Sequence, residues 1–226
     1  MTFKKILRPS GTPVSESVPF CMLLAVVGGF LDAYTFVGRG GVFCNAQTGN
    51  IVLVGVYLAT GKLHLALDHI PPILAFIVGV FLAERIKIWK KAILILETVV
   101  LFLVGFIPFS APGVLVTATV SLVASIQVSS FRKLVDTQFN TTMSTGNLRS
   151  ASQALYLAVT QKDTAAAVRS IRFFMVIFSF FSGALIGGFI TFFLGIKAIW
   201  STIALLTVAV VLVDREEPKK REMQNH

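Results

Sequence analysis

The chain has 226 residues, of which 55% are hydrophobic and 14% are charged. Its mean hydropathy of +0.81 lies outside the range of soluble domains of this length, so we expect an integral membrane protein. The net charge of +9 does not indicate a nucleic-acid-binding protein, because the cations lie between apolar runs and not on one interleaved face.

Six apolar runs are read as membrane spans. Gly183 and Gly187 in the fifth run have the small-xxx-small spacing that lets membrane helices approach closely, and we expect its many phenylalanines to contact lipid. The second run opens with Pro71-Pro72, since prolines are tolerated in a first helical turn. In chain order the runs are 18–37, 70–83, 92–107, 113–131, 171–194 and 196–213.

A tripeptide occurs twice between these runs. Thr48-Gly49-Asn50 returns ninety-seven positions later as Thr145-Gly146-Asn147. Each copy joins a polar, turn-forming run to a helix-like run of roughly 11 to 14 residues, whereas crossing a hydrocarbon core of about 30 Å takes about 20 residues. The second copy also carries Arg149, which would be costly facing lipid. We therefore predict two buried half-helices, at 48–60 and 145–160, that enter the membrane without crossing it.

The distribution of lysine and arginine supports this topology. If neither half-helix crosses, seventeen of the twenty cations lie in segments on the cytoplasmic side, as the positive-inside rule requires. Both tails (1–17 and 214–226) and residues 84–91 are then cytoplasmic, and the polar link 60–69 is periplasmic. Three crossings in the first half (18–110) invert the second half (111–213), which brings the two Thr-Gly-Asn segments together near the midplane.

The predicted fold class is therefore an all-α polytopic membrane protein with six transmembrane helices and two re-entrant half-helices in two inverted-topology repeats. Broken helices that meet at mid-membrane are the common plan of secondary transporters and of several channels.

Several motifs also resemble a known family. GGFLDAYTF, the first TGN segment, FRKL and FNTTMSTGNL, in this order, are similar to the YoaK family of uncharacterised bacterial inner-membrane proteins, and the similarity runs through nearly the whole chain. This resemblance implies a six-span bacterial membrane protein and supplies no substrate. The chain departs from the family's pattern at Ala46-Gln47, where a more apolar residue is usual, and at Gln127-Val128, where the family has a Gln-Asn pair.

The predicted site lies between the two half-helix N-termini, whose unpaired N–H groups and partial positive charge suit an anion or a carbonyl-rich solute. Thr48 and Thr145 could cap the helices, and the alternative is that the motif only ends and caps two short helices. Asp32, deep in the first span, is a functional candidate, with an ion pair to Arg39 or a hydrogen bond to the half-helix as its structural alternatives. The predicted substrate-binding residues are Asp32, Asn45, Gln47, Thr48, Gly49, Asn50, Gln127, Thr142, Thr145, Gly146 and Asn147.

Other polar residues receive structural interpretations. We expect Glu97 to pair with Lys90 or Lys91 near the cytoplasmic interface. His64, Asp68 and His69 fall short of a metal site without a further ligand, so no metal or cofactor is predicted. Cys21 and Cys44 are expected to lie too far apart for a disulfide.

The function predicted from the sequence is a membrane permease for a small polar or anionic metabolite, located in the bacterial inner membrane. An enzyme is disfavoured, because the chain has no nucleophile elbow, zinc-protease helix or P-loop. The alternative is a membrane scaffold or assembly protein with no transport activity. The predicted partners are the lipid bilayer and a small polar solute, and no nucleic acid is expected. The sequence leaves open whether the protein forms a homo-oligomer.

Overall fold

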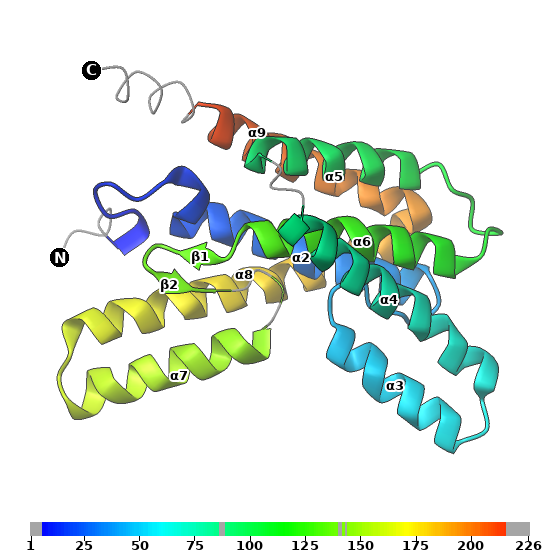
Figure 1. Ribbon diagram of the computed structural model, residues 1–226, viewed down its shortest axis with the longest axis horizontal. Helices are drawn as coiled ribbons and strands as arrows, with labels where there is room; N and C mark the ends of the chain where they lie inside the picture. The colour runs from blue at the N-terminus through cyan, green and yellow to red at the C-terminus, as the bar shows by residue number, and fades with distance from the viewer. Residues whose placement is uncertain (1–5, 86–88, 140–141, 143, 216–226) are drawn as a thin grey trace.

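The computed structural model describes residues 6–85, 89–139, 142 and 144–215, and this part of the chain is almost entirely helical (Figure 1). The elements in chain order are η1 (Val14–Glu16), α2 (Val18–Gly38), α3 (Gln47–Ala59), α4 (Leu63–Arg85), α5 (Lys90–Val104), α6 (Gly113–Ser130), β1 (Lys133–Leu134), β2 (Thr137–Gln138), α7 (Ser144–Thr160), α8 (Thr164–Leu194), η2 (Gly195–Trp200) and α9 (Ser201–Asp214). The two strands form one short antiparallel hairpin.

The predicted all-α membrane protein is confirmed at this level. In the described residues, four helical stretches are long and apolar enough to cross a membrane: Val18–Gly38, Leu63–Arg85, Gly113–Ser130 and Thr164–Asp214. The last stretch has 51 residues and contains the fifth and sixth predicted spans. Helix α5, the third predicted span, has 15 residues. Both Thr-Gly-Asn segments begin short helices, of 13 residues in α3 and 17 in α7.

Helix α4 begins earlier than the sequence predicts. It starts at Leu63, so Pro71 and Pro72 lie inside the helix and not in its first turn. Each proline lacks the N–H that would bond to the carbonyl one turn earlier. The Pro72 carbonyl accepts a hydrogen bond from Ser121 Oγ on α6 at 2.8 Å, so a neighbouring helix supports this region. The polar link between α3 and α4 is therefore limited to residues 60–62.

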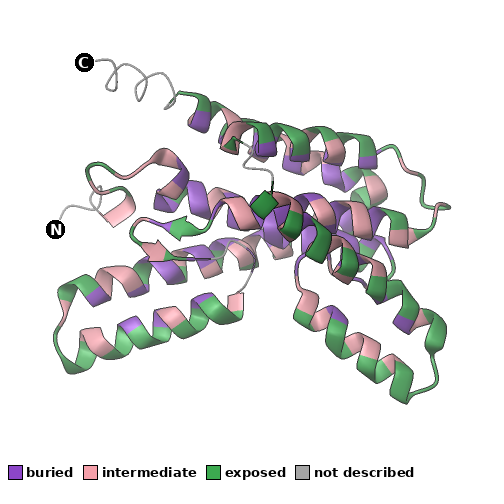
Figure 2. Ribbon diagram, in the orientation of Figure 1, coloured by how far each residue is buried: buried purple, intermediate pink, exposed green. Residues whose placement is uncertain are grey.

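The helices surround a central pair, α2 and α6. In their most apolar stretches, 67% of the α2 residues and 56% of the α6 residues are buried, against 22% in α4. Helix α2 packs on α8, and α6 packs on α4. The hairpins α3–α4 and α7–α8 diverge on either side of this centre (Figure 1). The outer faces of both hairpins are mostly exposed (Figure 2).

Glycines bring α2 and α8 into backbone contact. A Cβ atom on Gly29 would lie 2.0 Å from the Phe180 carbonyl oxygen, and one on Gly183 would lie 2.1 Å from the Val26 carbonyl oxygen. A Cβ on Gly187 would lie 2.7 Å from the Cα of Phe30. The small-xxx-small pair predicted from the sequence therefore faces α2 within the same chain.

The outer face of α8 is aromatic. Phe178, Phe189 and Phe192 are 68%, 65% and 77% exposed, although phenylalanine is usually buried in water-soluble domains. Such exposure over a long apolar helix fits contact with lipid chains, as the sequence predicts.

Ionic contacts gather several helix ends at one end of the molecule. Lys90 Nζ, at the start of α5, donates to Ser15 Oγ at 3.0 Å and lies 3.8 Å from Glu16, just before α2. Lys91 pairs with Asp214, the last residue of α9, at 2.5 Å. The beginnings of α2 and α5 and the end of α9 therefore lie together.

A buried arginine joins helix ends at the opposite end. Arg39 is 4% exposed, and its guanidinium donates to the Ile107 and Pro108 carbonyl oxygens at 2.8 and 3.2 Å. It also donates to the Tyr34 hydroxyl, which in turn donates to the Ile196 carbonyl oxygen at 3.2 Å. The end of α2 is thereby fixed to the segment after α5 and to the start of η2.

We expect Gly29→Ala to destabilise the fold, because the added methyl group would meet backbone atoms of α8 that cannot move independently. Overpacking of this kind costs about 1–3 kcal/mol. Thermal unfolding of the purified protein in detergent should show a lower midpoint. Gly55→Ala is the matched control, since a Cβ at this α3 position meets nothing within 4 Å. An unchanged midpoint for Gly29→Ala would contradict the close contact of α2 and α8.

Candidate functional site

A cavity of about 540 Å³ lies where the N-termini of α3 and α7 meet α2 and α8. Its wall includes Phe180, Ala184 and Gly188 from α8 and two aromatic residues, Phe36 and Phe43, near the end of α2 and before α3. Seven of the eleven predicted site residues also line it: Asp32, Asn45, Gln47, Thr48, Thr142, Thr145 and Gly146. The fold thus brings both Thr-Gly-Asn segments to one cavity, and solute binding there stays a prediction.

Asp32 joins α2 to the beginning of α3. Its Oδ1 atom accepts hydrogen bonds from the backbone N–H of Asn45 at 2.7 Å and of Ala46 at 3.4 Å. The carboxyl group is 5% exposed, and its Oδ2 atom is buried without a hydrogen-bond partner. In place of the two structural alternatives, the structure shows that Asp32 accepts hydrogen bonds from the loop directly before the half-helix. The ion pair with Arg39 is wrong, because that guanidinium binds carbonyl oxygens beyond α5.

Asp32 holds the loop that leads into α3, and no threonine caps the helix. The N-cap position is Ala46, which makes no side-chain cap bond, and Thr48 lies inside the first turn. The Gln47 and Gly49 N–H groups bond to the carbonyl oxygens of Asn45 and Ala46. The predicted Thr48 cap is therefore wrong. A carboxylate also suits the positive end of the helix dipole, so part of the anion-binding potential of α3 is already used.

Asn45, which also lines the cavity, has a second unpaired oxygen. Its Nδ2 atom donates to the Gly28 carbonyl oxygen at 3.2 Å and to Cys44 Sγ at 3.3 Å. Its Oδ1 atom is buried and has no partner. Two adjacent cavity residues thus each retain a hydrogen-bond acceptor that the protein leaves unmatched.

Asn50 does not line the cavity and is fully buried. Its Nδ2 atom donates to the Phe43 carbonyl oxygen at 2.7 Å and to Gln47 Oε1 at 2.9 Å. Its Oδ1 atom accepts from the Phe43 N–H at 3.0 Å and lies 3.1 Å from His69 Nδ1 on α4. These contacts favour the structural interpretation of this asparagine, which fixes the loop before α3 and ties α3 to α4.

Three further predicted residues lie away from the cavity wall. Gly49 packs against Phe43, whose ring would lie 3.0 Å from an added Cβ, and Asn147 is buried in α7. Gln127 donates to Glu97 Oε2 on α5 at 2.5 Å and does not line the cavity. The expected pairing of Glu97 with Lys90 or Lys91 is wrong, since Glu97 is 1% exposed and bonds to Gln127.

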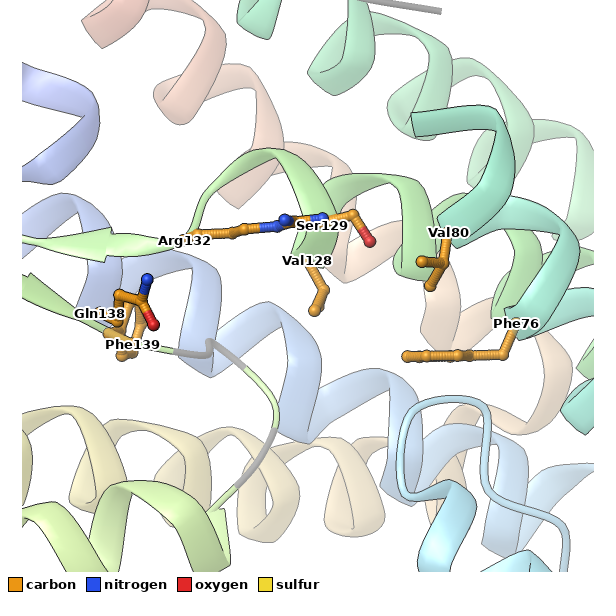
Figure 3. Close-up of a pocket in the computed structure, with 7 residues that line it drawn as sticks. All are labelled: Phe76, Val80, Val128, Ser129, Arg132, Gln138 and Phe139. Atoms are coloured by element: carbon orange, nitrogen blue, oxygen red, sulfur yellow. The ribbon is translucent and has the colours of Figure 1, made fainter. Parts of the chain in front are cut away.

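A second cavity, of about 340 Å³, was not identified from the sequence (Figure 3). Phe76 and Val80 of α4 lie at one side of it, and Gln138 and Phe139 lie at the other. The remaining lining residues are Val128, Ser129 and Arg132, and Arg132 pairs with Glu84 at the end of α4. Ser129 follows Asp32 by ninety-seven positions, the offset of the tripeptides. This offset was the sequence signal that could have indicated the second cavity. It was concealed because the position that corresponds to the Asp32 carboxylate holds a serine.

The remaining candidate groups do not form a site. His69 is buried beside Asn50, whereas His64 and Asp68 are exposed on α4. Within the described residues, no group of three or more His, Cys, Asp or Glu side chains is placed to hold a metal ion. Cys21 and Cys44 are both buried and free.

Comparison with known proteins gives the family. Residues 20–212 match the family model described as "Protein of unknown function (DUF1275)". The chain belongs to this family. It is also 27% identical over 140 residues to the UPF0700 transmembrane protein YoaK of Bacillus subtilis (strain 168), which agrees with the resemblance seen in the sequence. This match covers 57% of the chain and 62% of that relative, less than two thirds of its length. No solved structure gives a significant match.

A transmembrane relative and several long apolar helices together indicate a multi-pass membrane protein. The relative's name states no transported molecule, so the function has to be inferred from the chemistry of the cavity.

We expect Asn50→Ala to lower stability, because it leaves the buried Phe43 N–H and carbonyl groups without partners. An unsatisfied buried polar group costs about 1–3 kcal/mol. Thermal unfolding in detergent should therefore show a reduced midpoint. Thr48→Ala, on the cavity side of the same helix, serves as the control and should have little effect. If the two variants had equal midpoints, the structural role of Asn50 would be wrong.

Proposed function

We propose that the protein is a membrane permease for a small polar solute, with its binding site in the cavity between the N-termini of α3 and α7. The observation that carries the proposal is that two short helices, far apart in sequence, begin at one cavity whose wall holds a buried carboxyl group, Asp32. Ionisable groups within a span are costly and usually mark solute or ion pathways.

The packing of the helices supports two related halves. In the predicted repeat, helices α2, α3, α4 and α5 of the first half correspond in order to α6, α7, α8 and α9 of the second half. When each helix is replaced by its counterpart, the α2–α8 contact becomes the α6–α4 contact. The same replacement converts α3–α4 into α7–α8 and α5–α6 into α9–α2, and each of these pairs is in contact. This agreement supports the inverted repeat that many secondary transporters share.

The contacts at the helix ends support six crossings. The beginnings of α2 and α5 lie with the end of α9 through Lys90 and Lys91, and the ends of α2 and α5 lie together through Arg39. In Figure 1 the start of the described chain and the end of α9 lie on the same side. With the positive-inside distribution, this favours a bacterial inner-membrane protein with both termini in the cytoplasm.

Transport should depend on free space in the cavity. Gly146 lines it, and a Cβ there meets nothing within 4 Å, so Gly146→Leu can occupy the cavity without displacing backbone. We expect proteoliposomes with the wild-type protein to take up at least one small polar solute faster than protein-free liposomes, measured by stopped-flow light scattering over a solute panel. Gly146→Leu should reduce that rate at least about tenfold.

Gly55→Leu is the matched control for this experiment, because it adds the same side chain to an exposed position on α3 with open space around it. It should retain the wild-type rate. Uptake equal to that of protein-free liposomes for every solute would favour the scaffold alternative, and an unaffected Gly146→Leu would remove the cavity from the pathway.

The inverted repeat predicts opposite sides for two equivalent links. Lys62 follows α3 and Lys162 follows α7, and both are exposed. A membrane-impermeant thiol reagent applied to intact cells should modify Lys62→Cys and spare Lys162→Cys until the membrane is permeabilised. The native Cys21 and Cys44 are buried and give little background. Equal labelling of both positions in intact cells would contradict the inversion.

A further inference from the structure

We infer that the solute site accepts a small organic cation, an ammonium group attached to an apolar body, whose N–H groups bind Asp32 and Asn45. This assignment rests on the proposed site and narrows its substrate class, which the helix N-termini alone would leave open to anions.

The first argument is the hydrogen-bonding inventory of the cavity wall. Asp32 Oδ2 and Asn45 Oδ1 are buried acceptors without partners, on residues that are 5% and 3% exposed. Leaving a buried acceptor unpaired is costly, so such groups call for a ligand or water that donates hydrogen bonds. An ammonium group carries three donors and no acceptor, which matches this set. A carboxylate or phosphate ligand would place further acceptors against these oxygens.

The second argument is charge. Of the described residues, sixteen line the cavity, and Asp32 is the only ionisable one among these. The nearest candidate counter-ion in sequence, Arg39, directs its guanidinium to the Ile107 and Pro108 carbonyl oxygens. Asp32 is partly compensated at Oδ1 by the Cys44 thiol and by two backbone N–H groups just before α3, whereas Oδ2 is buried and has no partner. A cation that reaches Oδ2 would complete the neutralisation.

The third argument is the apolar part of the wall. The rings of Phe36 and Phe43 stack with centroids 4.7 Å apart, and both line the cavity with Phe180 and Ala184. Aromatic faces attract cations and also cover apolar ligand surface. A volume of about 540 Å³ exceeds the need of a bare metal ion or ammonium and falls in the usual range of small-molecule sites. An amine with a hydrocarbon body therefore fits better than an inorganic cation.

Binding to the purified wild-type protein in detergent tests the class directly. Benzylammonium, benzyl alcohol and benzoate share one apolar body and differ in charge, so their dissociation constants from isothermal titration calorimetry can be compared. We expect benzylammonium to bind at least about tenfold more tightly than benzyl alcohol, and benzoate to bind most weakly. Benzoate binding as tightly as benzylammonium, or no binding of benzylammonium, overturns the assignment without any mutation.

Asp32→Asn then tests the residue. The amide keeps the size of the side chain but cannot carry the charge, so the affinity for benzylammonium should fall about tenfold or more while that for benzyl alcohol stays unchanged. Glu97→Gln is the matched control, since Glu97 is an equally buried carboxyl group that does not line the cavity. Benzylammonium binding that survives in Asp32→Asn would overturn the role of Asp32.

This experiment separates the cation site from the permease. Tight, Asp32-dependent binding of benzylammonium without uptake by proteoliposomes would support the site and reject transport. Uptake of a neutral solute that benzylammonium fails to inhibit, together with no binding of the amine, would support transport and reject the cation assignment.

Discussion

The fold depends on how it supports the beginning of its short helices, because the first backbone N–H groups of a helix have no partner within the helix itself. At α3 this support comes from outside the helix. Asp32 of α2 accepts two N–H groups of the approaching loop, and Asn50 holds that loop through both backbone groups of Phe43. The same carboxyl group that satisfies the backbone keeps one oxygen unpaired beside the cavity, so structural support and the candidate site depend on one residue.

Close backbone packing makes this arrangement possible. Gly29 lies one helical turn before Asp32 on a related face of α2, and it lets α8 approach until the two backbones touch. Gly28, beside it, provides the carbonyl oxygen that Asn45 binds. A larger residue at this point of α2 would move α8 away and so increase the width of the cavity between the two helices. The fixed distance between the two helices therefore helps to define the position of the carboxyl group.

Much of the helical layout could be predicted from sequence, because its signals are local. Apolar runs define the long helices, and the polar Thr-Gly-Asn segments do begin the two short ones. The start of α4 was misplaced, since prolines usually mark a first turn and here both lie inside the helix. Helix boundaries of this kind depend on tertiary contacts that a single sequence does not display.

The composition of the candidate site was predictable in part, because some of its signals are also local. Asp32 was recognisable because a carboxyl group inside an apolar run is rare, and the repeat pointed to both helix N-termini. The partners of polar side chains were not predictable. Gln127 binds Glu97 on α5, and Asn50 binds the loop before α3 and lies beside His69. Each amide forms hydrogen bonds with the buried polar groups that the fold places next to it. Such pairings follow from the fold and not from spacing.

The two prolines inside α4 have a mechanical consequence. Pro71 and Pro72 each remove one hydrogen bond from the helix, so residues 63–70 are joined to the remainder of α4 less firmly than a continuous helix would allow. On its other side this segment is bound to α3 through the short link at 60–62 and through the contact of His69 with Asn50. Helix α3 and the first two turns of α4 therefore constitute one hinged element, whose amide protons should exchange with solvent as a group and before those of the inner part of α4.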